Sequence, residues 1–154
     1  MATVLRFKKL DPRATLPAYQ TSGASGFDFY STEKAVLRPG EVTLVSTGLA
    51  VEIPEGYEIQ VRARSGLAAK FGVFLVNGIG TIDADYRGEI KVIMSTCGQR
   101  PVVLEAGERI AQGVLSIVEQ CQIESTEALT STVRGDGGFG STGIRSAESN
   151  VNLF

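Results

Sequence analysis

The stretch YEIQVRARSGLAAKFG, residues 57–72, joins two different patterns of apolar side chains. Residues 57–63 alternate apolar and polar side chains, which is the period of a β-strand with one buried face. Residues 65–72 instead place helix-forming side chains between Ser65, which suits the N-cap of a helix, and Gly72, which suits its C-cap. We therefore predict a strand that leads directly into one short helix.

The strand pattern recurs along the rest of the chain. Similar apolar or alternating segments lie at residues 41–45, 49–53, 73–76, 89–94, 101–104 and 113–119. Turn-forming residues separate them at 38–40, 54–56, 77–78, 87–88 and 106–107. Strands that recur about every 8–12 residues with such turns are typical of a β-sandwich, a jelly roll or a barrel.

The composition is that of one soluble globular domain. The chain has 154 residues, of which 43% are apolar and 21% charged, and its net charge is −2. So small a charge disfavours broad electrostatic binding of duplex DNA. Histidine is absent, which excludes a Ser-His-Asp triad, a Cys-His pair and an HExxH metal site. If the chain is an enzyme, carboxylates, hydroxyls, arginines and a metal held mostly by substrate must carry the chemistry.

The cysteines and the apolar runs indicate a cytoplasmic protein. Cys97 and Cys121 lack CxxC spacing, and we expect them to be reduced structural residues. No apolar run approaches the roughly 18 residues of a membrane span. The N-terminal segment also lacks the apolar core of a signal peptide. We expect neither a membrane nor a nucleic acid as partner.

The segment NGIGTIDADYRGEI, residues 77–90, carries two carboxylates followed by a tyrosine and an arginine. Asp83 and Asp85 are two positions apart, so on a strand they would share one face. One interpretation is a hairpin in which these carboxylates satisfy turn amides. The other is a carboxylate base beside an aromatic wall.

The segment RARSGLA, residues 62–68, sets Arg64 and Ser65 at the start of the predicted helix. Free backbone amides and the helix dipole bind anions at such a position. The alternative interpretation is a capping serine beside a solvated arginine.

Two further segments combine polar and apolar residues in a short space. Residues 107–113, GERIAQG, hold Arg109 and Gln112 around two buried-looking residues, and could equally be the polar entry to a strand. Residues 23–31, GASGFDFYS, place Asp28 between two phenylalanines. A lone acid in that setting could simply face solvent on a strand.

The segment RGDGGFGSTG, residues 134–143, is half glycine and admits three interpretations. Glycine-rich sequence is most simply a linker. The RGD tripeptide is a weak adhesion signal. A phosphate clamp is the third interpretation, because glycines allow close approach of backbone amides to phosphate, while hydroxyl and guanidinium groups add donors.

Taken together and in this order, the five segments closely resemble the five motifs of the trimeric dUTP pyrophosphatases. The resemblance extends from about Ala24 to Gly143. It implies an all-β fold, a jelly-roll-like β-barrel with one short helix, assembled as a homotrimer with shared active sites. It also implies hydrolysis of dUTP to dUMP and pyrophosphate with Mg²⁺, a reaction that keeps uracil out of DNA and supplies dUMP for thymidylate synthesis.

The resemblance implies a role for several residues near the base, the sugar and the α-phosphorus. Asp83 matches the acid that activates water for attack, a role that suits a carboxylate ionised at neutral pH. Tyr86 matches the ring that packs against deoxyribose and leaves no room for a 2′-hydroxyl. Asn77 matches the hairpin asparagine that helps to read uracil.

The remaining implied roles concern the phosphates, the stacking of the base and the metal. The matching phosphate contacts are Arg64, Ser65, Gly66 and Gln112 on the core, and Arg134, Gly140, Ser141 and Thr142 in the last segment. Phe139 would stack over uracil. No direct protein ligand of Mg²⁺ is expected, and Asp28 is placed either near the water shell of the metal or in structural support.

The same resemblance sets the expected organisation of the chain. We expect a jelly-roll core over 1–123, a tether over 124–133, a C-terminal active-site arm over 134–143 and a mobile tail over 144–154. In the arm, Asp136 occupies a variable slot of the motif, so the RGD tripeptide is a coincidence of that slot.

The sequence departs from the family pattern at one position, and it fits two other functions less well. Ala63 replaces a proline that often precedes the second-motif arginine, which alters local rigidity only. Deamination of dCTP, known on the same fold, is disfavoured because no added glutamate constellation is present. A trimer that only binds partner proteins is disfavoured because all five motifs are complete.

Overall fold

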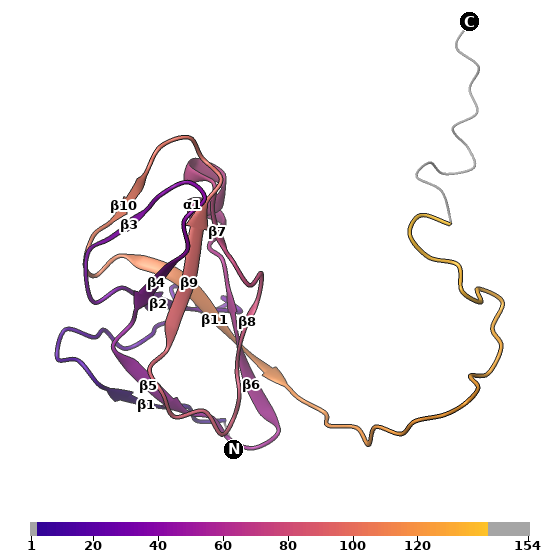
Figure 1. The fold of residues 1–154 in the computed structure, drawn as a ribbon. Coiled ribbons are helices and arrows are strands. Elements are labelled where there is room, and N and C mark those ends of the chain that lie inside the picture. The colour runs from indigo at the N-terminus through magenta and orange to yellow at the C-terminus, as the bar shows by residue number, and fades with distance from the viewer. Residues whose placement is uncertain (1–2, 142–154) are drawn as a thin grey trace, which may run out of the picture. The chain divides into compact units, whose positions relative to one another are not determined.

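The computed structural model describes residues 3–141, and within them strands dominate (Figure 1). The elements are β1 Arg6–Lys9, β2 Phe27–Tyr30, β3 Ala35–Leu37, β4 Thr43–Ser46, β5 Leu49–Glu52, β6 Tyr57–Arg62, α1 Ser65–Phe71, β7 Val73–Leu75, β8 Gly80–Ile82, β9 Lys91–Thr96, β10 Val102–Leu104 and β11 Arg109–Ile117. The prediction of an all-β fold with one short helix is confirmed.

The strands form four antiparallel sheets. The largest has the order β2-β11-β6-β8, and the next has the order β4-β9-β7. Two strand pairs, β1-β5 and β10-β3, complete the set. Within residues 3–141 the sheets are not closed into a barrel, because the outer strands β2 and β8 of the largest sheet each pair with one strand only. A jelly-roll-like description is compatible with this arrangement.

One hydrophobic core joins the two larger sheets. The predicted alternation is seen in β6, where Ile59 and Val61 are buried, and in β9, where Val92 and Met94 are buried. The strands β1, β2, β3 and β8 lie outside the predicted strand segments. β3 has only three residues, and in β1 only Phe7 is partly buried among exposed basic neighbours, so neither shows a recognisable period.

The helix begins one position differently from the prediction. Ser65 is its first residue, and Arg64 occupies the N-cap without a side-chain capping bond. Arg64 has extended backbone, and its carbonyl accepts hydrogen bonds from the amides of Leu67 and Ala68, both at 3.1 Å. Ser65 as N-cap was therefore wrong, because Ser65 is already helical and the extended residue before the helix is Arg64. Gly72 is the C-cap as predicted, with a left-handed φ of 65°.

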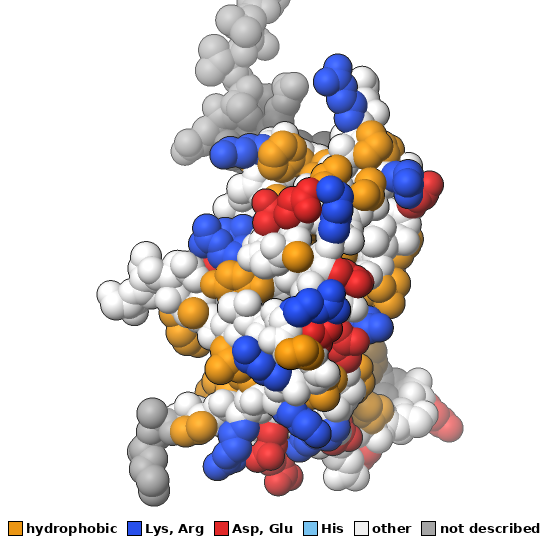
Figure 2. Space-filling view, turned by 90° about the vertical axis from the view of Figure 1, so that its left-hand side faces the viewer, with side chains coloured by type: hydrophobic (Ala, Val, Ile, Leu, Met, Phe, Trp, Pro, Cys, Tyr) orange, Lys and Arg blue, Asp and Glu red, His pale blue; other side chains and the backbone are white. Residues whose placement is uncertain are grey.

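The surface and the cysteines agree with the composition. Both cysteines are free thiols and both are exposed. On the face in Figure 2, acidic and basic side chains are interspersed, with apolar groups between them. Among the residues that the structure describes, no helix is both long enough and apolar enough to cross a membrane.

The chain divides after Gln120 into two units. The first contains every strand and the helix named above. In the second, residues 121–141 form turns and bends without helix or strand. The expected boundaries of tether, arm and tail remain predictions, and residues 144–154 lie outside the described part of the chain.

The central strand β11 generates a test of packing. Gly113 faces the rings of Phe27 and Phe29, which meet edge to face at 5.5 Å, and a Cβ added there would lie 2.5 Å from the Phe27 ring. We expect Gly113→Ala to lower the free energy of unfolding by about 1–3 kcal/mol, measured by urea denaturation at fixed protein concentration.

Gly23→Ala is the matched control, because a Cβ at Gly23 meets nothing within 4 Å. That variant should stay within about 0.5 kcal/mol of the parent chain. Equal stability of the two variants would show that the aromatic cluster tolerates the extra methyl group.

Candidate active site

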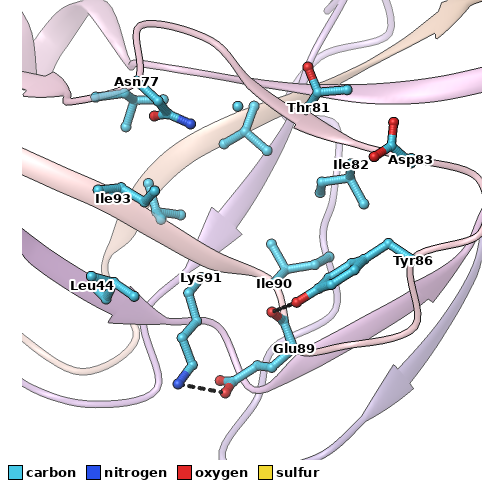
Figure 3. A pocket seen from close by; sticks show the side chains of 14 residues that line it. Leu44, Asn77, Thr81, Ile82, Asp83, Tyr86, Glu89, Ile90, Lys91 and Ile93 are labelled. Atoms are coloured by element: carbon cyan, nitrogen blue, oxygen red, sulfur yellow. Dashed lines mark hydrogen bonds and ion pairs between the residues drawn. The ribbon is translucent and has the colours of Figure 1, made fainter.

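The segment 77–90 forms one wall of a cavity of about 580 Å³ (Figure 3). Asn77, Asp83 and Tyr86, the three residues predicted in this segment, all line it. In Figure 3, Asp83 and Tyr86 lie near one another at one end of the cavity, and Asn77 lies toward the other end. The structure therefore brings together the three predicted residues of the third motif.

Local geometry explains how each of these side chains reaches the cavity. Asn77 precedes Gly78, whose φ of 71° makes the tight turn between β7 and β8. Strand β8 ends at Ile82, so Asp83 begins the next turn. The amide of Tyr86 donates to the carbonyl of Asp83 at 3.1 Å. This hydrogen bond closes the turn and so holds the two residues close together.

Three contacts hold Tyr86 itself. Besides the amide bond to Asp83, its hydroxyl donates to the carbonyl of Glu89 at 3.0 Å. Its ring also lies over Gly88, where an added Cβ would come within 2.6 Å of the ring carbon Cζ. Gly88 is needed here because any side chain would displace the ring.

Asp85 does not join Asp83 in this cavity. It lines a neighbouring hollow of about 780 Å³, which Asp83 also borders and to which Glu55, Glu58 and Arg87 contribute. The two acids share one face only if they lie on a strand, but both lie in the turn after β8. The structure thus separates Asp85 from the ring of Tyr86.

Asp28 is buried between two arginines. Only 7% of the Asp28 surface is exposed. Its Oδ1 lies 3.1 Å from Nε of Arg64, and its Oδ2 lies 3.3 Å from an amino group of Arg109. Arg64 also donates to the carbonyl of Arg109 at 3.0 Å. The interpretations of a solvent-facing Asp28 and a solvated Arg64 are therefore wrong, because each is the other's partner.

A β-bulge lets Arg109 join this group. In β11, Arg109 is opposite Tyr30 and Ala111 is opposite Phe29, so the register shifts between them. The extra residue, Ile110, is fully buried. Because the bulge uses three positions where a regular strand uses two, Arg109 and Gln112 reach the same face of the sheet as Asp28.

Gln112 is fixed beside this group. It is opposite Asp28 across β11 and β2, and its amide nitrogen donates to the carbonyl of Ala63 at 3.0 Å. Its amide oxygen lies so close to Gly26 that a Cβ there would be 2.6 Å away. Arg109 was not predicted as a site residue, and in a regular strand its spacing of three from Gln112 would place the two on opposite faces.

The predicted residues of the helix start are less enclosed. Ser65 and Gly66 are exposed in the first turn of α1. Arg64 and Arg109 border a hollow of about 490 Å³, together with Leu67 of α1. The structure therefore groups Arg64, Gln112 and Asp28, and places Asn77, Asp83 and Tyr86 in a separate cavity.

The glycine-rich arm, in the second unit, has its own local order. The Nε of Arg134 donates to the carbonyl of Gly137 at 2.8 Å, and the amide of Ser141 donates to the carbonyl of Gly138 at 2.9 Å. Phe139 is fully exposed, and its φ of 48° lies in the left-handed region that side chains rarely adopt. Thr142 lies outside the described residues.

One carboxylate outside the Asp83 cavity has a shifted pKa. The Arg13 side chain and the Arg13 backbone amide both donate hydrogen bonds to Asp11, and these bonds lower the pKa of Asp11 to about 2.

Within residues 3–141, no three histidine, cysteine or carboxylate side chains gather in a group that could hold a metal ion.

Comparisons with known proteins cover nearly the whole chain. The family model described as dUTPase matches residues 12–143. The chain is 54% identical to the deoxyuridine 5′-triphosphate nucleotidohydrolase of Hydrogenobaculum sp., over 92% of this chain and 99% of that protein. It is also 54% identical to the enzyme of the same name from Wolinella succinogenes, over 90% and 93%.

Solved structures give the same result. The dUTPase of Staphylococcus bacteriophage 80alpha, determined with dUpNHpp, superposes with a TM-score of 0.84 at 28% identity, over 93% of this chain and 100% of that one. A dUTPase from phage phi11 of S. aureus, described with a structural Mg(II) ion, has a TM-score of 0.76 at 23% identity, over 83% and 99%, and shows the fold alone. The chain belongs to the dUTPase family.

Proposed function

We propose that this chain hydrolyses dUTP to dUMP and pyrophosphate with Asp83 as the base. The oxygen of a water molecule attacks the α-phosphorus and passes a proton to the Asp83 carboxylate. The bond from the α-phosphorus to the bridging oxygen breaks, and pyrophosphate leaves with that oxygen. The observation that carries the proposal is the cavity shared by Asn77, Asp83 and Tyr86, which holds a carboxylate beside an aromatic wall.

The same cavity would select deoxyuridine over other nucleosides. The Tyr86 ring, held at its amide, its hydroxyl and its face, would fill the space of a 2′-hydroxyl and exclude UTP. The tight turn at Asn77 would present polar groups to the edge of uracil, so that cytosine would leave buried groups unpaired. That turn would also exclude the 5-methyl group of thymine.

The group around Asp28 supports a role in binding the triphosphate. The Asp28 carboxylate holds Arg64 in place, so this guanidinium is oriented before an anion arrives. Gln112 is fixed beside it, and Ser65 with Gly66 supplies exposed hydroxyl and amide groups. We assign Asp28 to structural support, since both of its oxygens already face a guanidinium.

The arm would close over the nucleotide. Phe139 is exposed in a conformation that costs about 1–2 kcal/mol, and stacking on uracil would compensate for that cost. Arg134, Gly140, Ser141 and Thr142 would hold the γ-phosphate through charge, amide and hydroxyl groups.

Mg²⁺ would reach the site on the triphosphate and neutralise part of its charge. The described residues fit this arrangement because they offer single carboxylates rather than a cluster. Asp28 is not needed as a ligand, even through water. The protein's own part is to orient the phosphates through Arg64 and Gln112.

A homotrimer with shared sites is supported by the outer face of the β4-β9-β7 sheet. Leu44 of β4 is opposite Ile93 of β9, and the amide of Val76 donates to the carbonyl of Ile93 at 3.0 Å. Leu44 is 57% exposed and Val76 42%, so an apolar row crosses this sheet. Leu44 and Ile93 also line the cavity of Asp83, so another copy packed here would complete the site.

The setting follows from the chemistry. Two exposed free thiols suit a reducing compartment, and we place the enzyme in the cytoplasm. There, removal of dUTP would keep uracil out of DNA and supply dUMP for thymidylate synthesis.

A panel of nucleotides tests the function directly. With dUTP, UTP, dTTP and dCTP each supplied with and without Mg²⁺, we expect pyrophosphate from dUTP with Mg²⁺, and at least about 100-fold lower kcat/KM for the others. Ammonia released from dCTP would instead identify a deaminase.

Asp83→Asn tests the base. The amide cannot accept the proton, so we expect kcat to fall by about 10²–10⁴-fold, while nucleotide affinity stays within about tenfold, or 1.4 kcal/mol. Asp85→Asn is the control, because Asp85 lies outside the Asp83–Tyr86 cavity, and it should retain turnover. Normal turnover in Asp83→Asn would remove Asp83 as the base.

Truncation before Arg134 tests the arm. The first unit contains every described strand, so the truncated chain should fold, and loss of the phosphate donors should lower kcat/KM by at least about 100-fold. A chain ending at Gly143 serves as control and should keep its activity. Loss of the circular dichroism signal in the shorter chain would make the arm structural.

A further inference from the structure

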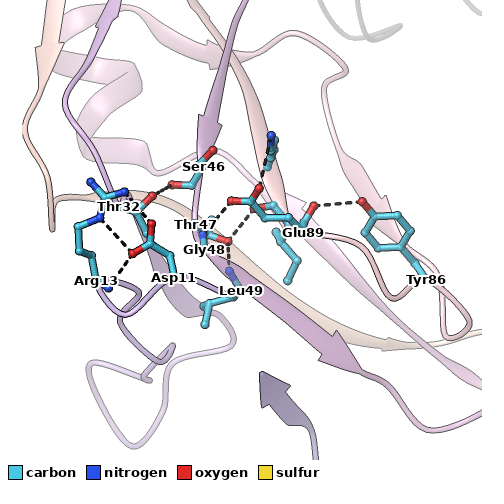
Figure 4. A network of polar contacts seen from close by, with 11 residues as sticks. Asp11, Arg13, Thr32, Ser46, Thr47, Gly48, Leu49, Tyr86 and Glu89 are labelled. Atoms are coloured by element: carbon cyan, nitrogen blue, oxygen red, sulfur yellow. Dashed lines mark hydrogen bonds and ion pairs between the residues drawn. The ribbon is translucent and has the colours of Figure 1, made fainter. Parts of the chain in front are cut away.

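We infer that Glu89 is a positioning residue for sugar discrimination, which it exerts by fixing the backbone carbonyl that holds the Tyr86 hydroxyl. The inference rests on the proposed role of Tyr86 against the 2′-hydroxyl. Glu89 itself also borders the cavity, but its carboxylate is directed away from the ring and toward the β4-β5 corner (Figure 4).

Tyr86 depends on few contacts for its orientation. The residue is 45% exposed, so packing against the core cannot fix its ring. Its hydroxyl reaches only across the turn, to the carbonyl oxygen of Glu89 at 3.0 Å. A shift of that carbonyl would therefore turn the ring that limits the space beside the sugar.

The carboxylate of Glu89 anchors this carbonyl to a distant part of the chain. Its Oε1 accepts a hydrogen bond from the amide of Gly48 at 3.1 Å. Its Oε2 lies 3.4 Å from Nζ of Lys91. The next residue, Ile90, continues the attachment: its amide donates to Leu49 at 2.8 Å, and its carbonyl accepts from the Thr47 hydroxyl at 2.6 Å.

The β4-β5 corner that receives Glu89 is itself closely packed. Gly48 has a φ of 64°, and a Cβ there would lie 2.8 Å from Cγ2 of Thr32 and 2.9 Å from Cβ of Asp11. Its carbonyl accepts from the amide of Leu10 at 2.8 Å. Contacts on both sides of Gly48 therefore hold the donor of the Glu89 carboxylate in place.

Of the two contacts, the hydrogen bond from Gly48 is the important one. The Glu89 carboxylate and Lys91 side chain are 25% and 44% exposed, and an ion pair so open to water contributes little. The Gly48 amide, in contrast, donates directly to this carboxylate, and loss of the carboxylate would leave the amide without that hydrogen bond. A glutamine at position 89 would keep an acceptor oxygen and lose only the charge.

The experiment measures kcat and KM of the full-length chain for dUTP and UTP. In Glu89→Ala, we expect the ratio of kcat/KM for dUTP to that for UTP to fall by about two- to tenfold, the value of one hydrogen bond. Glu89→Gln should restore most of the ratio. Glu52→Ala is the matched control, since among residues 3–141 that carboxylate pairs with the exposed Arg6 alone, and its ratio should not change.

Tyr86→Phe gives a second test that does not depend on how Glu89→Ala folds. It removes only the donor to the Glu89 carbonyl, so the ratio should fall by a similar factor, and the double variant Tyr86→Phe/Glu89→Ala should fall no further. An unchanged ratio in Tyr86→Phe, or additive effects in the double variant, would overturn the inference.

Tyr86→Ala separates this inference from the proposed function. If Tyr86→Ala leaves the ratio unchanged, Tyr86 does not discriminate the sugar and the proposed role fails with the inference. If Tyr86→Ala lowers the ratio while folded Glu89→Ala matches the parent chain, only the inference fails.

Discussion

The buried carboxylate of Asp28 is the interaction on which the proposed phosphate-binding surface depends. An unpaired charge at this depth would cost on the order of 3–5 kcal/mol, so its two oxygens require partners. Arg64 comes from the junction of β6 and α1, and Arg109 from the start of β11. One carboxylate therefore joins three strands and the helix start. It also holds two guanidinium groups in fixed positions, which is the form of preorganisation that binding of a charged substrate requires.

A second constraint organises the cavity of Asp83 and Tyr86. Residues 83–90 connect β8 to β9, and these two strands belong to different sheets. The Tyr86 amide closes the turn after Asp83, while Glu89 and Ile90 attach to the β4-β5 corner. The proposed base and the proposed sugar wall therefore belong to one turn, and the position of that turn depends on residues about forty positions earlier in the chain.

Much of the fold could be predicted from local pattern, and the failures have specific causes. Alternation predicted β6 and β9, and Gly72 predicted the end of α1, because period and backbone freedom are local properties. The N-cap was misplaced by one residue because serine is a favoured N-cap type, whereas the residue with extended backbone before the helix is Arg64. Asp83 and Asp85 would share a face only on a strand, and the choice between strand and turn stayed open in the sequence; β8 ends at Ile82, so both acids lie in the turn.

Composition, period and motif order can be read along the chain, so they were enough to predict the all-β class, the single helix, the family and the residues that carry its motifs. Which of those residues meet depends on the folded structure. The bulge at Ile110 turned Arg109 toward Asp28, and the corner at Gly48 received Glu89. Both depend on strand pairing between distant segments, and register is set by the packing of the whole core rather than by any local run of residues.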